Sequence, residues 1–331
     1  MNIGICQGSD IALYKSLKVT DTKHNCLLKE WDFKNQPLPF GTVRDNLLEV
    51  SNCFELLNPT PSANVLRNIS ITKKVRSARL YATALGFYNA YINGKKVGDL
   101  YYAPGFTDYR KRVRYQCYDI SEMFNFGENI FYATITKGYY TGFCNYMGPM
   151  IYGTQNFFMA KFVIDYADGS QEIIVTDDKW LYSDMGPTVE SEYLDGETYD
   201  ARLTLEDAVW ETCGVYEWPE SAKPSNGTLS NPVPFRVSPE ICPAAKEKFR
   251  IKAKFITENP KGHFIYDCGQ NLTGTISLTA KASKGTSIKI RYGEMCYKSG
   301  EIYVRNLRSA ANTDIYTFAS DRTETFVMYY P

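Results

Sequence analysis

The chain has 331 residues, and its 37 Lys plus Arg balance 37 Asp plus Glu, so the formal net charge is zero. Without a basic field to attract phosphate backbones, we expect no nucleic-acid partner. The length is sufficient for two domains of about 100–200 residues each.

The composition favours β structure and a carboxylate-based chemistry. There are 26 Tyr but only 2 His, so acid-base work would depend on Asp and Glu. The nine cysteines are spread along the chain without any C-x-x-C pair, which predicts reduced thiols and a cytoplasmic location. The start lacks a secretory pattern, and no apolar run is long enough for a membrane span.

Residues 1–65 have weak periodicity, and we interpret them as an irregular lead-in of short strands and loops that packs onto the first regular domain. The regular pattern begins near Ser77. Alternation in residues 78–84 places Leu80, Ala82 and Ala84 on one face of a predicted strand.

Two hairpins and one short helix are predicted next. The dipeptide Asn93-Gly94 suits a type I′ turn between strands at 87–92 and 95–98. Asp168-Gly169 turns a second hairpin, between 157–166 and 171–176. Residues 119–124 can form one or two helical turns with Asp119 or Ser121 as the cap.

A stretch rich in Pro, Ser, Asn and Gly between residues 218 and 239 is the expected domain boundary. Beyond it, strands at 275–280 and 287–291 predict a third hairpin. We therefore predict an all-β chain of two β-sandwiches: a jelly roll over residues 1–235, and a second sandwich over residues 236–331 that is truncated at its C-terminal end.

Several sequence segments, taken in their order along the chain, resemble the N-terminal domains of bacterial α-L-rhamnosidases, glycoside hydrolase family 78. The first group resembles the galactose-binding-like jelly roll of that family, and the second resembles its next β-sandwich. The segments of the first group are residues 78–86, 91–95, 103–113, 166–170, 176–180 and 193–202. The segments of the second group are residues 266–271, 291–294, 301–308 and 313–316.

The resemblance implies hydrolysis of terminal α-L-rhamnose from glycosides by a following (α/α)6 barrel. The sequence ends at Pro331 before such a helical region, so the expected partner is that missing catalytic domain and no catalytic residue can be assigned. The chain is predicted to support the barrel and to offer a binding surface for rhamnose.

The decapeptide 193–202 has the highest density of functional side chains in the sequence: three carboxylates, two tyrosines and one arginine. If Asp195 and Glu197 occupied one strand, they would lie about 7 Å apart, within the range of about 6.5–9.5 Å for inverting glycosidases. A self-sufficient hydrolase is therefore one hypothesis. The others are a sugar-binding loop or a structural corner, with the residues Asp195, Glu197, Tyr199, Asp200 and Arg202 as candidates.

The Gly- and Tyr-rich stretch 138–152 is the second candidate, because long loops on rigid sandwiches often carry ligand contacts. Tyr139, Tyr140, Asn145 and Tyr152 are its candidate sugar-binding residues. An aromatic cluster that closes the sandwich is the alternative.

In the second sandwich, Asp267, Gln270 and Asn271 can face a ligand or an interface, or satisfy buried backbone groups. Some relatives of the first domain bind rhamnose with calcium, but no acidic spacing here assigns calcium ligands. A purely structural or interaction protein is a further hypothesis for the whole chain.

Overall fold

The structure is a computed structural model that describes residues 62–144, 148–215, 236–259, 261–308 and 310–329, and the backbone of four earlier strands. The chain divides into two units, Met1–Pro59 with Arg305–Ala311, and Thr60–Val304 with Asn312–Pro331. In the first unit β1 pairs with β4 and β2 with β3. Its elements are β1 (Asn2–Cys6), β2 (Ser16–Asp21), β3 (Cys26–Asp32), β4 (Leu47–Ser51) and the 3-10 turn η2 (Arg305–Leu307).

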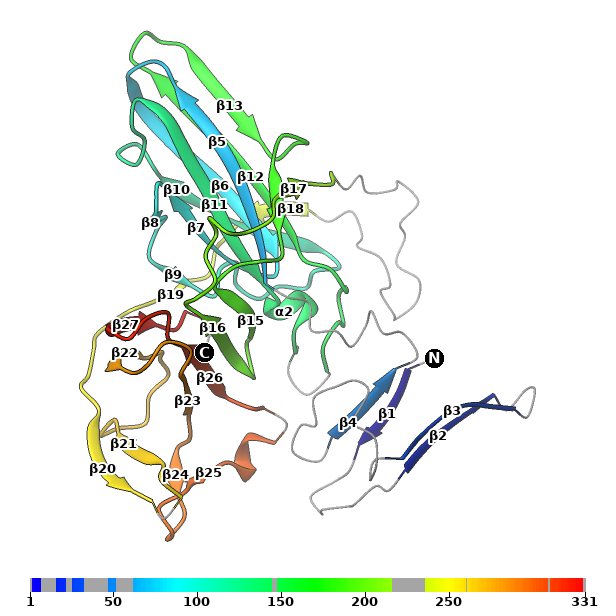
Figure 1. The fold of residues 1–331 in the computed structure, drawn as a ribbon. Helices are drawn as coiled ribbons and strands as arrows, with labels where there is room; N and C mark the ends of the chain where they lie inside the picture. The colour runs from blue at the N-terminus through cyan, green and yellow to red at the C-terminus, as the bar shows by residue number, and fades with distance from the viewer. Residues whose placement is uncertain are drawn as a thin grey trace. The chain divides into compact units, whose positions relative to one another are not determined.

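The second unit begins with a sandwich of two sheets (Figure 1). The five-stranded sheet has the order β13 (Gln171–Val175), β12 (Phe157–Tyr166), β6 (Val75–Leu85), β10 (Arg112–Asp119) and β18 (Arg236–Pro239). The six-stranded sheet has the order β17 (Glu211–Thr212), β14 (Leu181–Ser183), β5 (Ala63–Ile71), β11 (Gly127–Thr136), β7 (Phe87–Ile92) and β8 (Lys95–Lys96). The all-β prediction is confirmed.

The jelly-roll core follows from the alternation of its strands. Leu80, Ala82 and Ala84 on β6 are at most 2% exposed, as predicted from their period of two. Facing them, Phe131 on β11 packs edge-on against Phe162 and Trp180, at ring distances of 5.0 and 5.5 Å. The regular pattern starts earlier than Ser77, because β5 already begins at Ala63.

Both predicted jelly-roll hairpins are confirmed. Asn93 and Gly94 have φ of 51° and 77° between β7 and β8, the positive values that a type I′ turn requires. The helix predicted over 119–124 is wrong: β10 continues to Asp119, and a single turn follows in which the Met123 N–H bonds to the Ile120 carbonyl at 3.0 Å. Asp119 still caps this turn by accepting from the Ser121 N–H at 3.0 Å.

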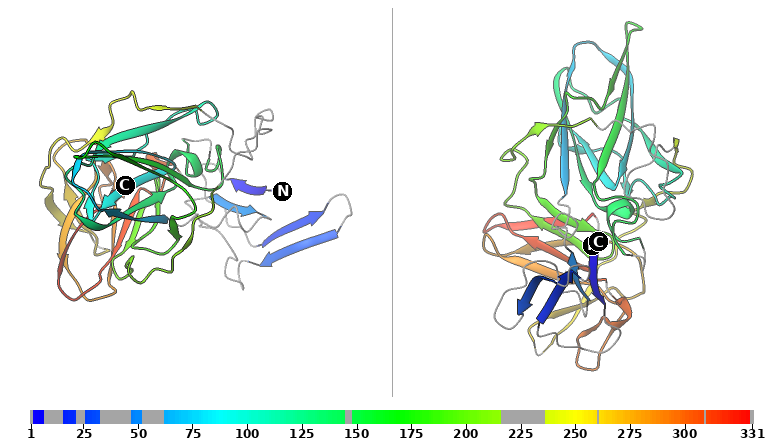
Figure 2. Two further views of the ribbon diagram at one scale, coloured as in Figure 1. Left: turned by 90° about the horizontal axis from the view of Figure 1, so that it is seen from above. Right: turned by 90° about the vertical axis from the view of Figure 1, so that its right-hand side faces the viewer.

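A second sandwich is built around a four-stranded sheet that combines the 188–200 hairpin with strands near the C-terminal end of the second unit (Figures 1 and 2). Its order is β15 (Thr188–Glu192), β16 (Gly196–Asp200), β26 (Thr313–Thr317) and β23 (Ser287–Arg291). Two-stranded pairs complete it: β22 (Ser277–Lys281) with β27 (Thr323–Val327), β20 (Lys254–Glu258) with β21 (Phe264–Asp267), and β24 (Met295–Cys296) with β25 (Ile302–Tyr303). The pair β9 (Leu100–Tyr101) with β19 (Ala245–Lys246) joins sequence from the two predicted domains.

The third predicted hairpin has the right strands but the wrong pairing. β22 pairs with β27 and β23 pairs with β26, so the connection between β22 and β23 crosses from one layer to the other. Leu278 of β22 and Ile288 of β23 both pack on the core of Tyr316, Phe318, Phe326 and Met328. The alternation predicts two strands with one apolar face each, but a hairpin and a crossing between layers satisfy that pattern equally.

Within the described residues, α2 (Gly138–Thr141) is the one α-helix, and no helix there has the length and apolar character needed to cross a bilayer. The linker expected around the boundary at residue 235 lies largely in 216–235, outside the described residues.

Candidate functional site

The decapeptide forms the turn and second strand of the β15–β16 hairpin, and β16 runs parallel to β26. Gly196 opens the strand with φ of 103°, and a Cβ there would lie 2.2 Å from the Thr313 carbonyl oxygen. Glycine is therefore required for the close approach of the two strands. Asp195 lies in the preceding turn, so it and Glu197 are not successive positions on one face of a strand as the hydrolase hypothesis assumed.

Glu197 is a buried link in the hydrogen-bond network between strands. It is 2% exposed, and its carboxylate accepts from the Tyr329 N–H at 2.9 Å and the Thr188 hydroxyl at 3.3 Å. Its own N–H donates to the carboxylate of Asp314 at 2.8 Å. Asp314 is fully buried, accepts from the Tyr292 hydroxyl, and has its pKa raised by burial.

Tyr329 also connects this network to the jelly roll. The Lys96 ammonium lies 4.3 Å from the centre of the Tyr329 ring and 5.0 Å from that of Tyr101, within the range of a cation–π contact. Burial lowers the pKa of Lys96 to about 8.

At the C-terminal end of the decapeptide, the side chains contact other side chains of the protein. Asp200 accepts from Arg202 Nε at 2.9 Å and Nη2 at 2.7 Å, and these hydrogen bonds hold the pKa of Asp200 below its usual range. The Tyr199 ring stacks on Tyr316 at 5.6 Å. These residues stabilise a corner of the second sandwich, one of the alternatives that the sequence left open.

The turn of the hairpin contributes to an aromatic patch, which we define as Tyr102, Phe106, Tyr139 and Tyr193. Tyr139 on α2 lies 5.1 Å from Tyr193 and 5.4 Å from Phe106, and Tyr193 lies 6.0 Å from Tyr102. Phe106 is 56% and Tyr193 38% exposed. The patch thus brings one residue of each predicted site, the decapeptide and the 138–152 stretch, onto one surface.

Phe87 forms the floor of this patch. It is 1% exposed, and its ring lies 5.0 Å from Tyr139, 5.4 Å from Tyr102 and 6.5 Å from Tyr193. Tyr102 has φ of 56°, a left-handed conformation that costs a bulky residue about 1–3 kcal/mol. Met150 and Arg308 have similar φ values of 60° and 57°, so this strain is not particular to the patch.

Glu192, which no sequence pattern indicated, lies beneath the patch. It is 2% exposed and accepts from the Phe143 and Leu194 N–H groups, each at 2.6 Å, and from the Asp195 N–H at 3.0 Å. No spacing in the sequence marks this residue, because its burial depends on a loop 49 positions away.

The other predicted residues of the 138–152 stretch lie elsewhere. Tyr140 is 2% and Tyr152 8% exposed, and both belong to a core cluster with Tyr109. Burial leaves little ring surface for a ligand, so these two fit the closing aromatic cluster that was the alternative. Asn145 lies outside the described residues.

Asp267, Gln270 and Asn271 are exposed at and beyond the end of β21. Asp267 accepts from the Gly269 N–H at 2.7 Å, which stabilises the local turn. Their exposure differs from the expectation that this motif satisfies buried backbone groups, and a ligand or interface role stays a prediction.

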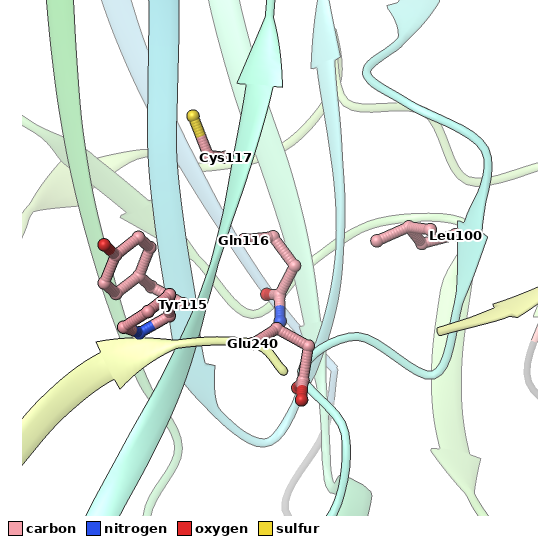
Figure 3. A pocket seen from close by; sticks show the side chains of 6 residues that line it. Leu100, Tyr115, Gln116, Cys117 and Glu240 are labelled. Atoms are coloured by element: carbon pink, nitrogen blue, oxygen red, sulfur yellow. The ribbon is translucent and has the colours of Figure 1, made fainter. Parts of the chain in front are cut away.

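A hollow of about 290 Å³ lies apart from these residues, between β10 and the segment after β18 (Figure 3). It is lined by Leu100, Tyr115, Gln116, Cys117, Pro239 and Glu240, and includes no member of the aromatic patch. In the described part of the chain, no three His, Cys, Asp or Glu side chains converge as metal ligands. We therefore assign no ligands to calcium.

Comparisons with known proteins match both halves of the second unit. Residues 73–232 match the α-L-rhamnosidase N-terminal domain, and residues 257–330 match the bacterial α-L-rhamnosidase concanavalin-like domain. The chain is 39% identical over 254 residues to an α-L-rhamnosidase of Streptomyces avermitilis, covering 77% of this chain and 24% of that enzyme. An α-L-rhamnosidase of Formosa agariphila is 31% identical over 255 residues, with 76% and 27% covered.

Solved structures agree with this. The S. avermitilis α-L-rhamnosidase complexed with L-rhamnose superposes with a TM-score of 0.72 at 34% identity, covering 82% of this chain and 26% of that one. The native Aspergillus terreus α-L-rhamnosidase gives 0.73 at 29% identity, with 82% and 31% covered. The chain spans about a quarter of the length of the curated relatives. Through these two domains, it belongs to the bacterial α-L-rhamnosidase family.

Proposed function

We propose that this chain is the non-catalytic N-terminal part of an α-L-rhamnosidase, which supports a catalytic domain and binds rhamnose. The observation that carries the proposal is the environment of Glu197. Glu197 is 2% exposed and its carboxylate accepts a hydrogen bond from the Tyr329 N–H. It therefore stabilises the contact between strands and cannot reach a substrate. A general acid or nucleophile must reach the reacting bond.

The two other carboxylates of the decapeptide support the same conclusion. Asp200 is engaged by two nitrogen atoms of Arg202, and Asp195 lies in the hairpin turn beside Tyr193. An inverting or retaining glycosidase needs two carboxyl groups facing one bond. Because no such pair forms from these residues, we do not favour a self-sufficient hydrolase.

The aromatic patch is the surface that we propose for sugar binding. The exposed Tyr193 ring and the half-buried Tyr139 and Tyr102 rings have an apolar face with a polar edge, which suits a pyranose ring with one apolar side. Asp195 follows Tyr193 by two residues and can accept hydrogen bonds from sugar hydroxyls. The proposed ligand is a terminal α-L-rhamnose of a glycoside.

Two measurements test this function. The purified chain should not hydrolyse an aryl α-L-rhamnoside above the uncatalysed rate, and turnover abolished by Glu197→Gln would contradict the non-catalytic role. Calorimetric titration with millimolar L-rhamnose should give a heat of binding. If no heat of binding appeared with or without added calcium, the binding part would be wrong and a purely structural role would stand.

A further inference from the structure

Glu192 connects two segments that are far apart in the sequence. Its Oε1 atom accepts from Phe143, just after α2, and its Oε2 atom accepts from Leu194 and Asp195 in the hairpin turn. A Cβ on Gly142 would lie 2.7 Å from Oε1, so the glycine permits this close approach. One buried carboxylate thus bonds to three backbone N–H groups.

These two segments carry the central rings of the aromatic patch. Tyr139 is one turn before Phe143 in a segment stabilised by the Gly142 N–H to Gly138 carbonyl bond at 3.1 Å. Tyr193 lies directly between Glu192 and Leu194. The distance of 5.1 Å between the Tyr139 and Tyr193 rings therefore depends on the position of the Glu192 carboxylate.

We propose that Glu192 is a positioning residue that clamps the α2 segment to the β15–β16 turn and so fixes the spacing of Tyr139 and Tyr193. The clamp itself follows from the hydrogen bonds, whereas its effect on sugar affinity rests on the proposed function. Each oxygen of the Glu192 side chain accepts from a different segment, so a single side chain can hold both segments.

The charges around Glu192 make the clamp sensitive to pH. Burial raises the pKa of Glu192 to about 7, and the charge of Asp195 acts in the same direction. The N–H groups of Phe143 and Leu194, and Lys137, oppose this shift, and Lys137 is itself paired with Glu190.

The direction of the pH effect follows from linkage. In an open conformation, with Glu192 in water, its pKa would be near 4.5. The closed clamp binds the proton more tightly, so it is most favoured in acid and loses free energy as the pH rises from about 4.5 to about 7. Above that range both conformations are ionised, and no further change is expected.

Hydrogen exchange with residue resolution tests the clamp in the intact chain. At pH 6, Glu192→Gln should raise the exchange rates of the Phe143, Leu194 and Asp195 amides about tenfold or more, because an amide nitrogen replaces one accepting oxygen. Glu192→Asp, which is one methylene shorter, should also release one segment. The control is Glu172→Gln, which removes a carboxylate that binds Tyr166 in the same jelly roll and should leave these three amides unchanged.

The wild-type pH profile tests the clamp without any substitution. After correction for intrinsic exchange, protection of the three amides should fall between pH 5 and 7 and then level off, and the profile of Glu192→Gln should be flat. Unchanged exchange in both Glu192 variants, or a flat wild-type profile, would overturn the proposal.

L-Rhamnose titrations separate this proposal from the proposed function. If wild type binds the sugar, both Glu192 variants should bind it at least about tenfold more weakly, and equal affinity would overturn the positioning role. If wild type does not bind, the proposed sugar function fails, while the exchange rates still decide whether the clamp exists.

Discussion

The two sandwiches of the second unit differ in how completely each covers its own core. In the jelly roll, five- and six-stranded sheets enclose residues such as Phe131 and Phe162, both 0% exposed. In the second sandwich, two of the four strands of the main sheet come from the 188–200 hairpin, and the β20–β21 pair leaves Phe255 49% and Phe264 62% exposed. The jelly roll encloses its own core, whereas the second sandwich leaves large apolar side chains exposed.

The largest predicted effect concerns core packing in these two regions. Phe131→Ala should lower the free energy of unfolding by about 3–5 kcal/mol, because it leaves a cavity against Phe162 and Trp180. Phe255→Ala, the same change on the exposed β20–β21 pair, should cost less than about 1 kcal/mol. Urea unfolding followed by Trp fluorescence measures both, and equal losses would contradict the contrast.

The next effect concerns the β15–β16 hairpin, which supplies two strands of the second sandwich. Gly196→Ala should destabilise by more than about 1–3 kcal/mol, since backbone strain adds to the clash with Thr313. Gly127→Ala is the matched control, with φ of 93° and nothing within 4 Å of its Cβ. If the two variants lost the same stability, the close approach of β16 to β26 would not be a constraint.

A smaller effect is expected at the corner of the second sandwich. Arg202→Ala should cost about 0.2–1 kcal/mol at pH 7, because the pair with Asp200 is partly exposed. The pKa of Asp200 is lowered in the folded state, so its contribution is present above pH 3.8 and is lost as the pH falls through the folded value. The difference between wild type and variant should vanish in acid, and a constant difference would exclude the ion pair as its source.

The smallest effect on the free energy of unfolding is expected for a substitution that changes the self-association of the chain. Exposed aromatic rings on β20–β21 predict concentration-dependent self-association of this chain. Phe264→Ser should reduce it with little change in unfolding free energy, as measured by sedimentation velocity over a range of concentrations. Exposed Phe106→Ser, in the aromatic patch of the jelly roll, is the control, and an equal reduction there would contradict the assignment to β20–β21.

Local features were predictable from the sequence, and contacts between distant segments were not. Asn93-Gly94 defines its own turn, so the β7–β8 hairpin could be predicted. The strands at 277–281 and 287–291 could also be predicted, but their partners could not, because pairing depends on strands near 313–327. The same limit applies to the site. The three carboxylates of the decapeptide predicted a catalytic or sugar-binding role, but the role of each depends on its burial, which the sequence does not show.

Glu197 and Glu192 illustrate that limit most clearly. Glu197 was a candidate because it lies in a dense motif, yet Tyr329, 132 positions away, occupies its carboxylate. Glu192 lies one residue outside the motif and carries no signal of its own, yet it joins two predicted sites. Only the folded chain shows that Tyr193 of the motif is exposed to solvent whereas its acid Glu197 is buried.

The central claim is that the exposed rings of the patch bind the sugar while the buried carboxylates stabilise the fold. Calorimetric titration with L-rhamnose of wild type, Tyr193→Ala and Tyr182→Ala tests it most directly, since the two tyrosines are 38% and 36% exposed and only Tyr193 belongs to the patch. We predict affinity at least about tenfold weaker in Tyr193→Ala, or about 1.4 kcal/mol, and unchanged in Tyr182→Ala. Equal affinity in all three proteins would contradict the account.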